Sequence, residues 1–352
     1  MWVTASLTTV LTPTAIALGN FDGVHRGHYQ VIHPILPRRP LHQPRAINNE
    51  DVALTLGKPP TWQQLETSCE SAATPTGPPY PTVVTFDPHP RAFFSQADCP
   101  LITPLAEKRQ LLQAMGVAQL VLLPFNHDLA SLSPAAFVET ILIQHLQAQQ
   151  ISVGEDFRFG HQRAGTALDL RRLAGRYGVT VTIVPNQTSQ DQRISSSMIR
   201  AALAAGDIAQ ANRLLGRPYH LWGTVVAGQQ LGRTIGFPTA NLQVDAAKFL
   251  PRRGVYSVWV CPMTAIGGEP VSPAQRWAGV MNIGCRPTVD GQQQTIEVHL
   301  LDWSGDLYGQ TLRVDVEAFL RPEQRFASLA DLAAQIHADC QAARAMLLGP
   351  AA

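Results

Sequence analysis

The sequence lacks a large excess of charge of either sign. Of its 352 residues, 27 are lysine or arginine and 26 are aspartate or glutamate, so the formal net charge is +1. Domains that bind nucleic acid, or that attach to an anionic membrane surface, usually carry a clear basic excess. The near balance of charges therefore argues against nucleic acid and membranes as partners.

Cysteines and long apolar runs are also scarce. The chain has five cysteines, an odd number, widely spaced and without a C-x-x-C pair, which argues against a disulfide framework and against a zinc site. No apolar run is long enough to span a membrane, and the N-terminus has no basic segment followed by an apolar stretch. We expect a soluble cytoplasmic protein.

The first half of the sequence alternates short apolar runs with helical patterns. Helices are predicted from Pro104 to Met115, where Gly116 suits a helix end, and from Ser133, a good N-cap. Strands alternating with helices form a parallel sheet covered on both faces, so an α/β domain is predicted. The apolar runs predicted as strands are 15–18, 83–86, 120–123, 151–153 and 179–184.

A proline-rich insert interrupts this alternation. Residues 34–81 contain ten of the 27 prolines of the chain, a density that prevents a regular helix or an interior strand. We predict a surface loop or a disordered insert, with a short helix near 62–71. Such long loops are more often functional or disordered than packed.

The second half has the pattern of an antiparallel β structure. Glycines and prolines separate its short apolar runs at turn positions, which is typical of a barrel or a sandwich. A continuous helix is predicted from Met198 to Leu215. A final helix is predicted from Ser328, with Leu329, Leu332, Ile336, Cys340 and Ala343 on one face. The predicted strands are 223–226, 255–260, 277–282, 295–301 and 312–319.

A first candidate site is the run G-N-F-D-G-V-H-R-G-H from Gly19 to His28. A helix that starts near Val24 would place His25 and His28 on one face of its first turn, where free N–H groups and the helix dipole favour phosphate. Imidazoles and amides there could stabilise charge on an attacked α-phosphate and on departing pyrophosphate. Two alternatives are open: surface histidines beside an ordinary turn, or half of a metal site.

Three further runs follow predicted strands or precede a helix: F-D-P-H-P-R from Phe86, G-E-D-F-R-F-G from Gly154 and S-S-S-M-I-R from Ser195. Arg200 could reach a phosphate, and Asp156 could bind the polar edge of a ligand. Serines before a helix are ordinarily N-caps, Arg200 could be an exposed helix residue, and Asp156 could cap a turn.

A second candidate site combines G-F-P-T-A-N, from Gly236 to Asn241, with the run from Thr295 to Asp302. Thr239 and Asn241 offer hard oxygens at alternate positions of an extended segment, and Mg²⁺ favours such ligands together with phosphates. On a strand, Glu297 and His299 face away from Ile296, Val298 and Leu300, so Glu297 could take the proton of an alcohol. The alternatives are a glycine-rich turn with polar caps and a solvated strand glutamate.

Together these runs resemble the prokaryotic bifunctional riboflavin kinase/FMN adenylyltransferase family, also called FAD synthetases. The resemblance covers about residues 14–345 apart from the insert, and rests on the run from Gly19, T-F-D-P-H-P, G-x-D-F-x-F-G, I-S-S-S-x-I-R, G-F-P-T-A-N and E-x-H-L-L-D-x-x-x-D-L-Y-G. It implies a Rossmann-like nucleotidyltransferase domain followed by a flavokinase-like barrel. The corresponding boundaries are 1–200 and 218–352, with a connecting helix at 201–217.

The resemblance also implies roles for individual residues. Glu297, His25 and His28 are expected to be catalytic. Thr239 and Asn241 are expected to hold Mg²⁺ with ATP, and Leu231 stands where the family often has arginine. In the adenylyltransferase domain, ATP is assigned to Gly19, Phe21, Asp22, Gly23, His25, His28, Ser196, Ser197 and Arg200. In the kinase domain, ATP is assigned to Gly228, Gly232, Arg233, Gly236, Thr239 and Asn241. Flavin binding is assigned to Asn126, Asp156, Phe157 and Arg321.

The resemblance implies two reactions in sequence. Riboflavin and ATP would give FMN, and FMN and a second ATP would give FAD and pyrophosphate, both with Mg²⁺. Three alternatives are open: an adenylyltransferase whose barrel only binds flavin, a flavin-responsive regulator without turnover, and adenylylation of a different small phosphate.

Overall fold

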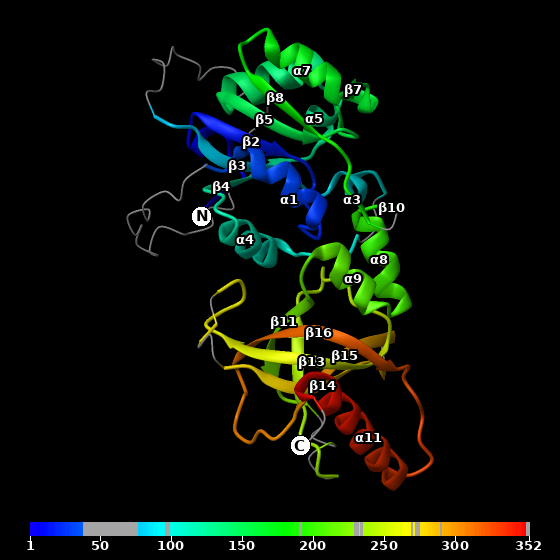
Figure 1. Ribbon diagram of the computed structural model, residues 1–352. Helices are drawn as coiled ribbons and strands as arrows, with labels where there is room; N and C mark the ends of the chain where they lie inside the picture. The colour runs from blue at the N-terminus through cyan, green and yellow to red at the C-terminus, as the bar shows by residue number, and fades with distance from the viewer. Residues whose placement is uncertain are drawn as a thin grey trace. The chain divides into compact units, whose positions relative to one another are not determined.

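In this computed structural model the described residues are 1–37, 77–95, 99–189, 192–228, 232, 235–268, 270–271, 275–288 and 291–349. They form two compact units (Figure 1). The first unit is Met1–Phe21, Gly27–Cys99 and Leu111–Thr188, and the second is Asp22–Arg26, Pro100–Gln110 and Ser189–Ala352. Most of the predicted insert, including the helix expected near 62–71, lies outside the described residues.

The first unit contains a six-stranded sheet in which every neighbouring pair is parallel, in the order β1-β4-β3-β2-β5-β8. Five of these strands confirm the predicted apolar runs. The sequence pattern missed β1, which has three residues and pairs at the sheet edge with β4. The strands are β1 Trp2–Thr4, β2 Thr14–Leu18, β3 Tyr80–Asp87, β4 Gln119–Pro124, β5 Ala148–Gly154 and β8 Thr180–Val184.

Helices and a small hairpin complete the chain up to residue 175, of which residues 22–26 and 100–110 belong to the second unit. As predicted, Ser133 caps a helical segment: its hydroxyl accepts from the Ala136 N–H at 3.1 Å. The core joins strand residues such as Ile16 and Ile151 to helix residues such as Ile141 and Leu170. The segments are η1 Leu7–Thr9, α1 Arg26–Ile32, η2 His33–Ile35, α3 Pro90–Ser95, α4 Leu105–Ala114, α5 His127–Ser131, α6 Pro134–Ala136, the π-helix η5 Phe137–His145, β6 Arg158–Phe159, η6 His161–Arg163, β7 Gly165–Thr166 and α7 Ala167–Gly175.

The second unit is built on a closed antiparallel barrel in the order β11-β12-β15-β14-β13-β16. The apolar cluster that contains its interior residues continues into α8 and α9. The prediction of a barrel is confirmed, although β12 was expected only as a short extended segment. From residue 188 onward the strands are β9 Thr188–Ser189, β10 Gln192–Arg193, β11 Tyr219–Val226, β12 Ala240–Val244, β13 Gly254–Met263, β14 Trp277–Thr288, β15 Gly291–Leu300 and β16 Thr311–Arg321, and the helices are α8 Ser196–Ala205, α9 Ile208–Leu215 and α11 Leu329–Leu348.

One helix prediction is wrong in detail, whereas the final helix begins after Ser328 as predicted. The helix expected from Met198 to Leu215 is broken at Gly206, whose φ of 83° is left-handed, and Asp207 then caps α9. In the final helix, Leu329 is 64% exposed because the packed face begins later, at Ile336. That helix, α11, packs on the outer face of the barrel strands β13 and β14. None of the helices in the described ranges is long and apolar enough to cross a membrane.

Candidate functional site

Glu297 lies in a row of polar residues across three barrel strands. It is directly opposite Asn241 of β12 and Asn282 of β14, so the three side chains share one face of the sheet. Ile296 and Val298, its neighbours on β15, are buried in the core at 3% and 1% exposure. Glu297 therefore lies on the outer face and is half-buried, which confirms the orientation that the alternation predicted.

Two glycines, Gly228 and Gly232, lie close to the amide of Asn241 and the hydroxyl of Thr239 beside this row. A Cβ atom on Gly228 would overlap the Asn241 side-chain amide. One on Gly232 would overlap the Phe237 carbonyl and lie 3.4 Å from Thr239 Oγ1. The Gly232 backbone can lie this close to the Phe237 carbonyl because glycine has no side chain. Gly236 has a φ of 89°, and Arg233 lies outside the described residues.

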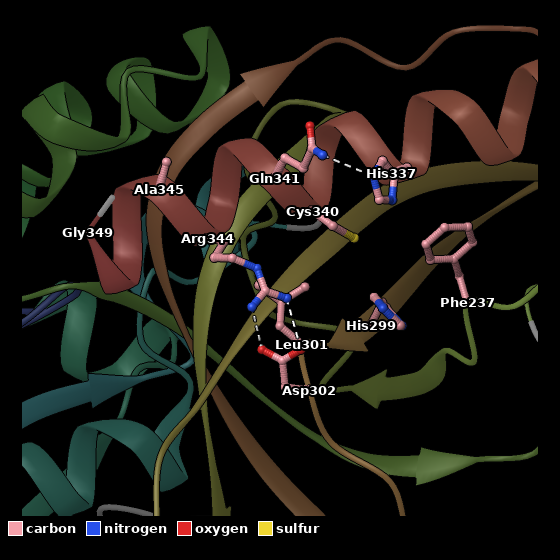
Figure 2. A pocket seen from close by; sticks show the side chains of 10 residues that line it. All are labelled: Phe237, His299, Leu301, Asp302, His337, Cys340, Gln341, Arg344, Ala345 and Gly349. Atoms are coloured by element: carbon pink, nitrogen blue, oxygen red, sulfur yellow. Dashed lines mark hydrogen bonds and ion pairs between the residues drawn. The ribbon is translucent and has the colours of Figure 1, made fainter. Parts of the chain in front are cut away.

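A cavity of about 490 Å³ lies on the same face of the barrel, between the end of β15 and α11 (Figure 2). His299, two residues beyond Glu297, lines it; its Nδ1 is 2.8 Å from the Pro238 carbonyl and its ring meets the edge of Phe237 at 5.5 Å. Asp302 pairs with Arg344 of α11 through contacts of 2.6 and 2.9 Å. The volume is within the range of about 300–1,000 Å³ that small-molecule pockets occupy.

These lining residues were not predicted as site residues. The E-x-H spacing places His299 on the Glu297 face and could have identified it. No sequence pattern near Arg344 marks it as a site residue, because only the packing of α11 brings it to Asp302. Arg321, predicted to bind flavin, is 15% exposed in its side chain and bound by Asp339 through Nε and Nη2 at 2.9 and 2.8 Å.

In the second unit, three residues predicted to bind ATP lie together. Asp22, 1% exposed, forms an ion pair with Arg200 and accepts the Thr103 N–H at 3.2 Å. Ser196 donates its hydroxyl to the Asp22 carbonyl at 2.8 Å. The ion pair partly neutralises the Arg200 charge, and because Asp22 is buried it also orients the guanidinium. Ser197 is exposed at the second position of α8.

The histidine pair differs from the prediction. The α1 helix begins at Arg26, because Val24 has a left-handed φ of 40°, so His25 precedes the helix instead of sharing its first turn with His28. His25 is 6% exposed, and burial with the charges of Arg217 and Arg193 lowers its pKa to about 4. Its imidazole is therefore neutral at pH 7, able to donate one hydrogen bond and accept another.

In the first unit, His28 is half-buried, and its ring lies 5.2 Å from that of Phe21. A Cβ atom on Gly19 would lie 3.4 Å from the same Phe21 ring. Three predicted ATP-binding positions, Gly19, Phe21 and His28, are thus neighbours at the end of β2. The Phe21 ring packs against the His28 ring at an interplanar angle of 57°.

The residues expected at the flavin side of this unit follow β4 and β5. The Asn126 side chain accepts the Leu129 N–H at 2.9 Å and so caps α5. Phe157 stacks on Phe159 with centroids 5.7 Å apart and an interplanar angle of 14°. Asp156 is exposed in the turn after β5.

Comparison with known families matches both halves of the chain. Residues 215–347 match the family described as riboflavin kinase, and residues 8–43 and 65–198 match the family described as FAD synthetase. The unmatched stretch between 43 and 65 falls within the proline-rich insert.

Individual relatives cover nearly the whole chain. A bifunctional riboflavin kinase/FMN adenylyltransferase of Pseudomonas fluorescens is 40% identical over 330 residues, covering 94% of this chain and 91% of the relative. The protein of the same description from Escherichia coli K12 is 37% identical with the same coverage. A solved structure described as a macrolide-efflux protein from Streptococcus pneumoniae superposes with a TM-score of 0.75 at 28% identity, covering 97% of this chain and 98% of that one.

Proposed function

This chain belongs to the bifunctional riboflavin kinase/FMN adenylyltransferase family, and from that premise we propose how its residues divide the two reactions. The enzyme makes FMN from riboflavin and FAD from FMN, using ATP in both steps. Kinase and nucleotidyltransferase chemistry differ in the phosphorus atom attacked, so each reaction needs its own arrangement of charge around ATP.

In the kinase reaction, Glu297 is the general base that takes the proton from the 5′-hydroxyl of riboflavin. The observation that carries this assignment is the position of Glu297 on the outer barrel face, beside Asn241 and two residues from His299 of the cavity. Riboflavin occupies that cavity, with Phe237 and α11 against it. A general base of this kind contributes roughly 10²–10⁴-fold to the rate.

Thr239 and Asn241 hold Mg²⁺ with ATP in the kinase site. Their hydroxyl and amide oxygens are hard ligands of the kind that Mg²⁺ accepts. Gly228 lies against the Asn241 side chain and Gly232 lies near the Thr239 hydroxyl, with no side chain of their own in between. The ion, when bound, neutralises charge on the phosphates as the phosphoryl group is transferred. The phosphates of this ATP are assigned to Gly228, Gly232, Arg233 and Gly236, as the resemblance to the family implies.

In the adenylyl transfer, His25 and His28 stabilise the α-phosphate and the departing pyrophosphate without forming a covalent bond. A neutral His25 donates an N–H to a phosphate oxygen. Arg200, held by Asp22, and the hydroxyls of Ser196 and Ser197 complete the binding of ATP, with Mg²⁺ as counter-ion. The remaining ATP contacts are assigned to Gly19, Phe21 and Gly23.

Flavin specificity is assigned to two further sets of residues. Asn126, Asp156 and Phe157 hold FMN in the adenylyl-transfer site. On the kinase side, Arg321 acts through Asp339 by fixing α11 along the cavity. That assignment makes Arg321 a positioning residue in place of a direct ligand.

A pair of variants tests the division. Glu297→Gln should slow conversion of riboflavin to FMN by roughly 10²–10⁴-fold while conversion of FMN to FAD continues. His28→Ala should slow only the conversion of FMN to FAD. Flavins separated by chromatography after incubation with ATP and Mg²⁺ give both rates. Glu317→Gln, a half-buried barrel glutamate outside the site, should leave both rates within about twofold of the wild type.

The outcome also decides between alternatives. If Glu297→Gln or His28→Ala removed both activities in a folded protein, the two-site assignment would be wrong. If the wild-type enzyme formed no FMN, the barrel would only bind flavin. Tight flavin binding without consumption of ATP would indicate a regulator.

A further inference from the structure

We propose that Arg217 is a positioning residue for adenylyl transfer, because it holds the turn that carries His25. The proposal rests on the proposed role of His25 in that reaction. Arg217 lies between α9 and β11, at the beginning of the part of the chain that matches riboflavin kinases. It is thus a residue of the kinase sequence that acts on the adenylyl-transfer turn.

The two terminal nitrogens of Arg217 bind consecutive carbonyls of that turn. Nη2 donates to the Gly23 carbonyl at 2.7 Å, and Nη1 donates to the Val24 carbonyl at 2.9 Å. The Nε atom is buried and has no hydrogen-bond partner among the described residues. The planar guanidinium fork matches two neighbouring acceptors, a geometry that a lysine ammonium cannot reproduce.

The turn requires such support because its backbone is unusual. Gly23 and Val24 both have positive φ, 90° and 40°, and a β-branched residue in this region is an outlier. Unusual backbone of this kind persists only where the surroundings hold it. Arg217 fixes both peptide units immediately before His25, and so fixes where the imidazole points.

The charge of Arg217 acts on His25 as well. Burial lowers the pKa of Arg217 to about 10, so the guanidinium stays protonated at neutral pH. Burial is the largest cause that lowers the pKa of His25, and the charges of Arg217 and Arg193 lower it further. Around Arg217 itself, Glu107 and Asp315 are negative and Arg313 is positive. Removing the charge of Arg217 should therefore raise the pKa of His25 toward its ordinary value of 6.5.

The test uses the full-length enzyme and measures the two reactions separately. Arg217→Met keeps an unbranched side chain but removes both donors, and should lower kcat/KM for FMN adenylylation roughly 100-fold. Arg217→Lys keeps the charge without the fork and should lower it roughly tenfold. Phosphorylation of riboflavin should change by less than about twofold in both. Arg213→Met, on the exposed side of α9, is the matched control and should change neither rate.

Two readouts separate positioning from a general loss of structure. The acid limb of the pH profile for adenylylation should move to higher pH in Arg217→Met and stay near the wild type in Arg217→Lys. In a His25→Ala background, Arg217→Met should have much less effect than in the wild type, because both changes act through the same imidazole.

Several results overturn the proposal. The proposal is wrong if both Arg217 variants adenylylate FMN at a rate within about twofold of the wild type. It is also wrong if Arg217→Met lowers the rate as much in the His25→Ala background as in the wild type. If Arg217→Met fails to fold, Arg217→Lys decides, and loss of both activities there would assign Arg217 to folding instead. If His25→Ala alone leaves adenylylation intact, the proposed site fails. If His25→Ala abolishes it and the Arg217 variants do not, only this inference fails.

Discussion

The side chains of Glu107 and Lys248 form an ion pair that is almost fully removed from solvent. Their residues are 3% and 5% exposed, and Lys248 Nζ lies 2.5 Å from Glu107 Oε2 and 2.8 Å from the Ile102 carbonyl. His220 Nε2 is 3.4 Å from the same carboxylate, and burial keeps the pKa of His220 well below its ordinary value. Lys248 is therefore the main compensation for the buried carboxylate charge.

Replacing Lys248 should be costly for this reason. Lys248→Met removes the cation that is hydrogen-bonded to the Glu107 carboxylate, and breaking a buried pair in this way costs about 3–5 kcal/mol. Glu107→Gln in the same chain should recover part of the loss, since the remaining group is then neutral. Urea unfolding of the full-length protein measures both changes.

An exposed ion pair of the same unit supplies the comparison. Arg276 contacts Glu317 at 3.3 Å with 43% of its own side chain exposed, so Arg276→Met should cost only about 0–1 kcal/mol of charge interaction. If Lys248→Met and Arg276→Met lowered the free energy of unfolding equally, burial would not be the reason for the cost of breaking the Glu107–Lys248 pair.

At the scale of elements, α8 and α9 are separated by a glycine that the helical pattern did not reveal. Gly206 ends α8 with a φ of 83°, and its N–H is 3.1 Å from the Leu203 carbonyl. Asp207 then starts α9 by accepting the Gln210 N–H at 2.9 Å. The break redirects the chain so that apolar residues of both helices join the barrel core.

Gly206→Ala should destabilise the protein. A side chain in left-handed backbone costs roughly 1–2 kcal/mol, and the new Cβ would meet Phe319 and Arg252 only at ordinary contact distances of 3.4 and 3.5 Å. Gly175→Ala, at the end of α7 where nothing lies within 4 Å, should be neutral or stabilising by roughly 0.5–1 kcal/mol. Thermal unfolding compares the two, and a stabilising Gly206→Ala would refute the backbone argument.

At the scale of the molecule, the compact units and the family matches divide the chain differently. Segments 22–26 and 100–110 fall in the part that matches FAD synthetases, yet they belong to the same compact unit as the barrel. Ile102, 0% exposed, joins the apolar cluster of that unit. The domain boundaries predicted at residues 200 and 218 follow the family motifs in the sequence, and they stay a prediction.

A fragment with residues 189–352 should phosphorylate riboflavin, because Glu297, Thr239 and the lining of the cavity all lie within it. It should unfold at a lower temperature than the corresponding transition of the full chain, by roughly 10 °C, since it lacks Ile102 and Glu107. Calorimetry and chromatography of the flavins measure these two properties.

The fragment also gives an internal control. Lys248→Met, destabilising in the full chain, should be neutral or stabilising in the fragment, because the partner carboxylate is gone. A fragment as stable as the full chain would show that segments 22–26 and 100–110 contribute little to this unit.

The amino-acid sequence by itself determined the larger part of this protein. Short apolar runs predicted five of the six strands of the parallel sheet, since strands buried on both faces are nearly continuously apolar. Strict alternation in β15 placed Glu297 on the face opposite Ile296 and Val298. The motifs placed the chain in its family before any contact was known.

Only the tertiary structure decided how the sites are supported. Arg217 reaches Gly23 and Val24 across 193 or more positions of the chain, and Arg344 reaches Asp302 across 42. Such pairs leave no periodic pattern, because each depends on where separate elements pack. The start of α1 at Arg26 likewise follows from the left-handed Val24, a backbone choice that local propensity opposes and that the surrounding contacts hold in place.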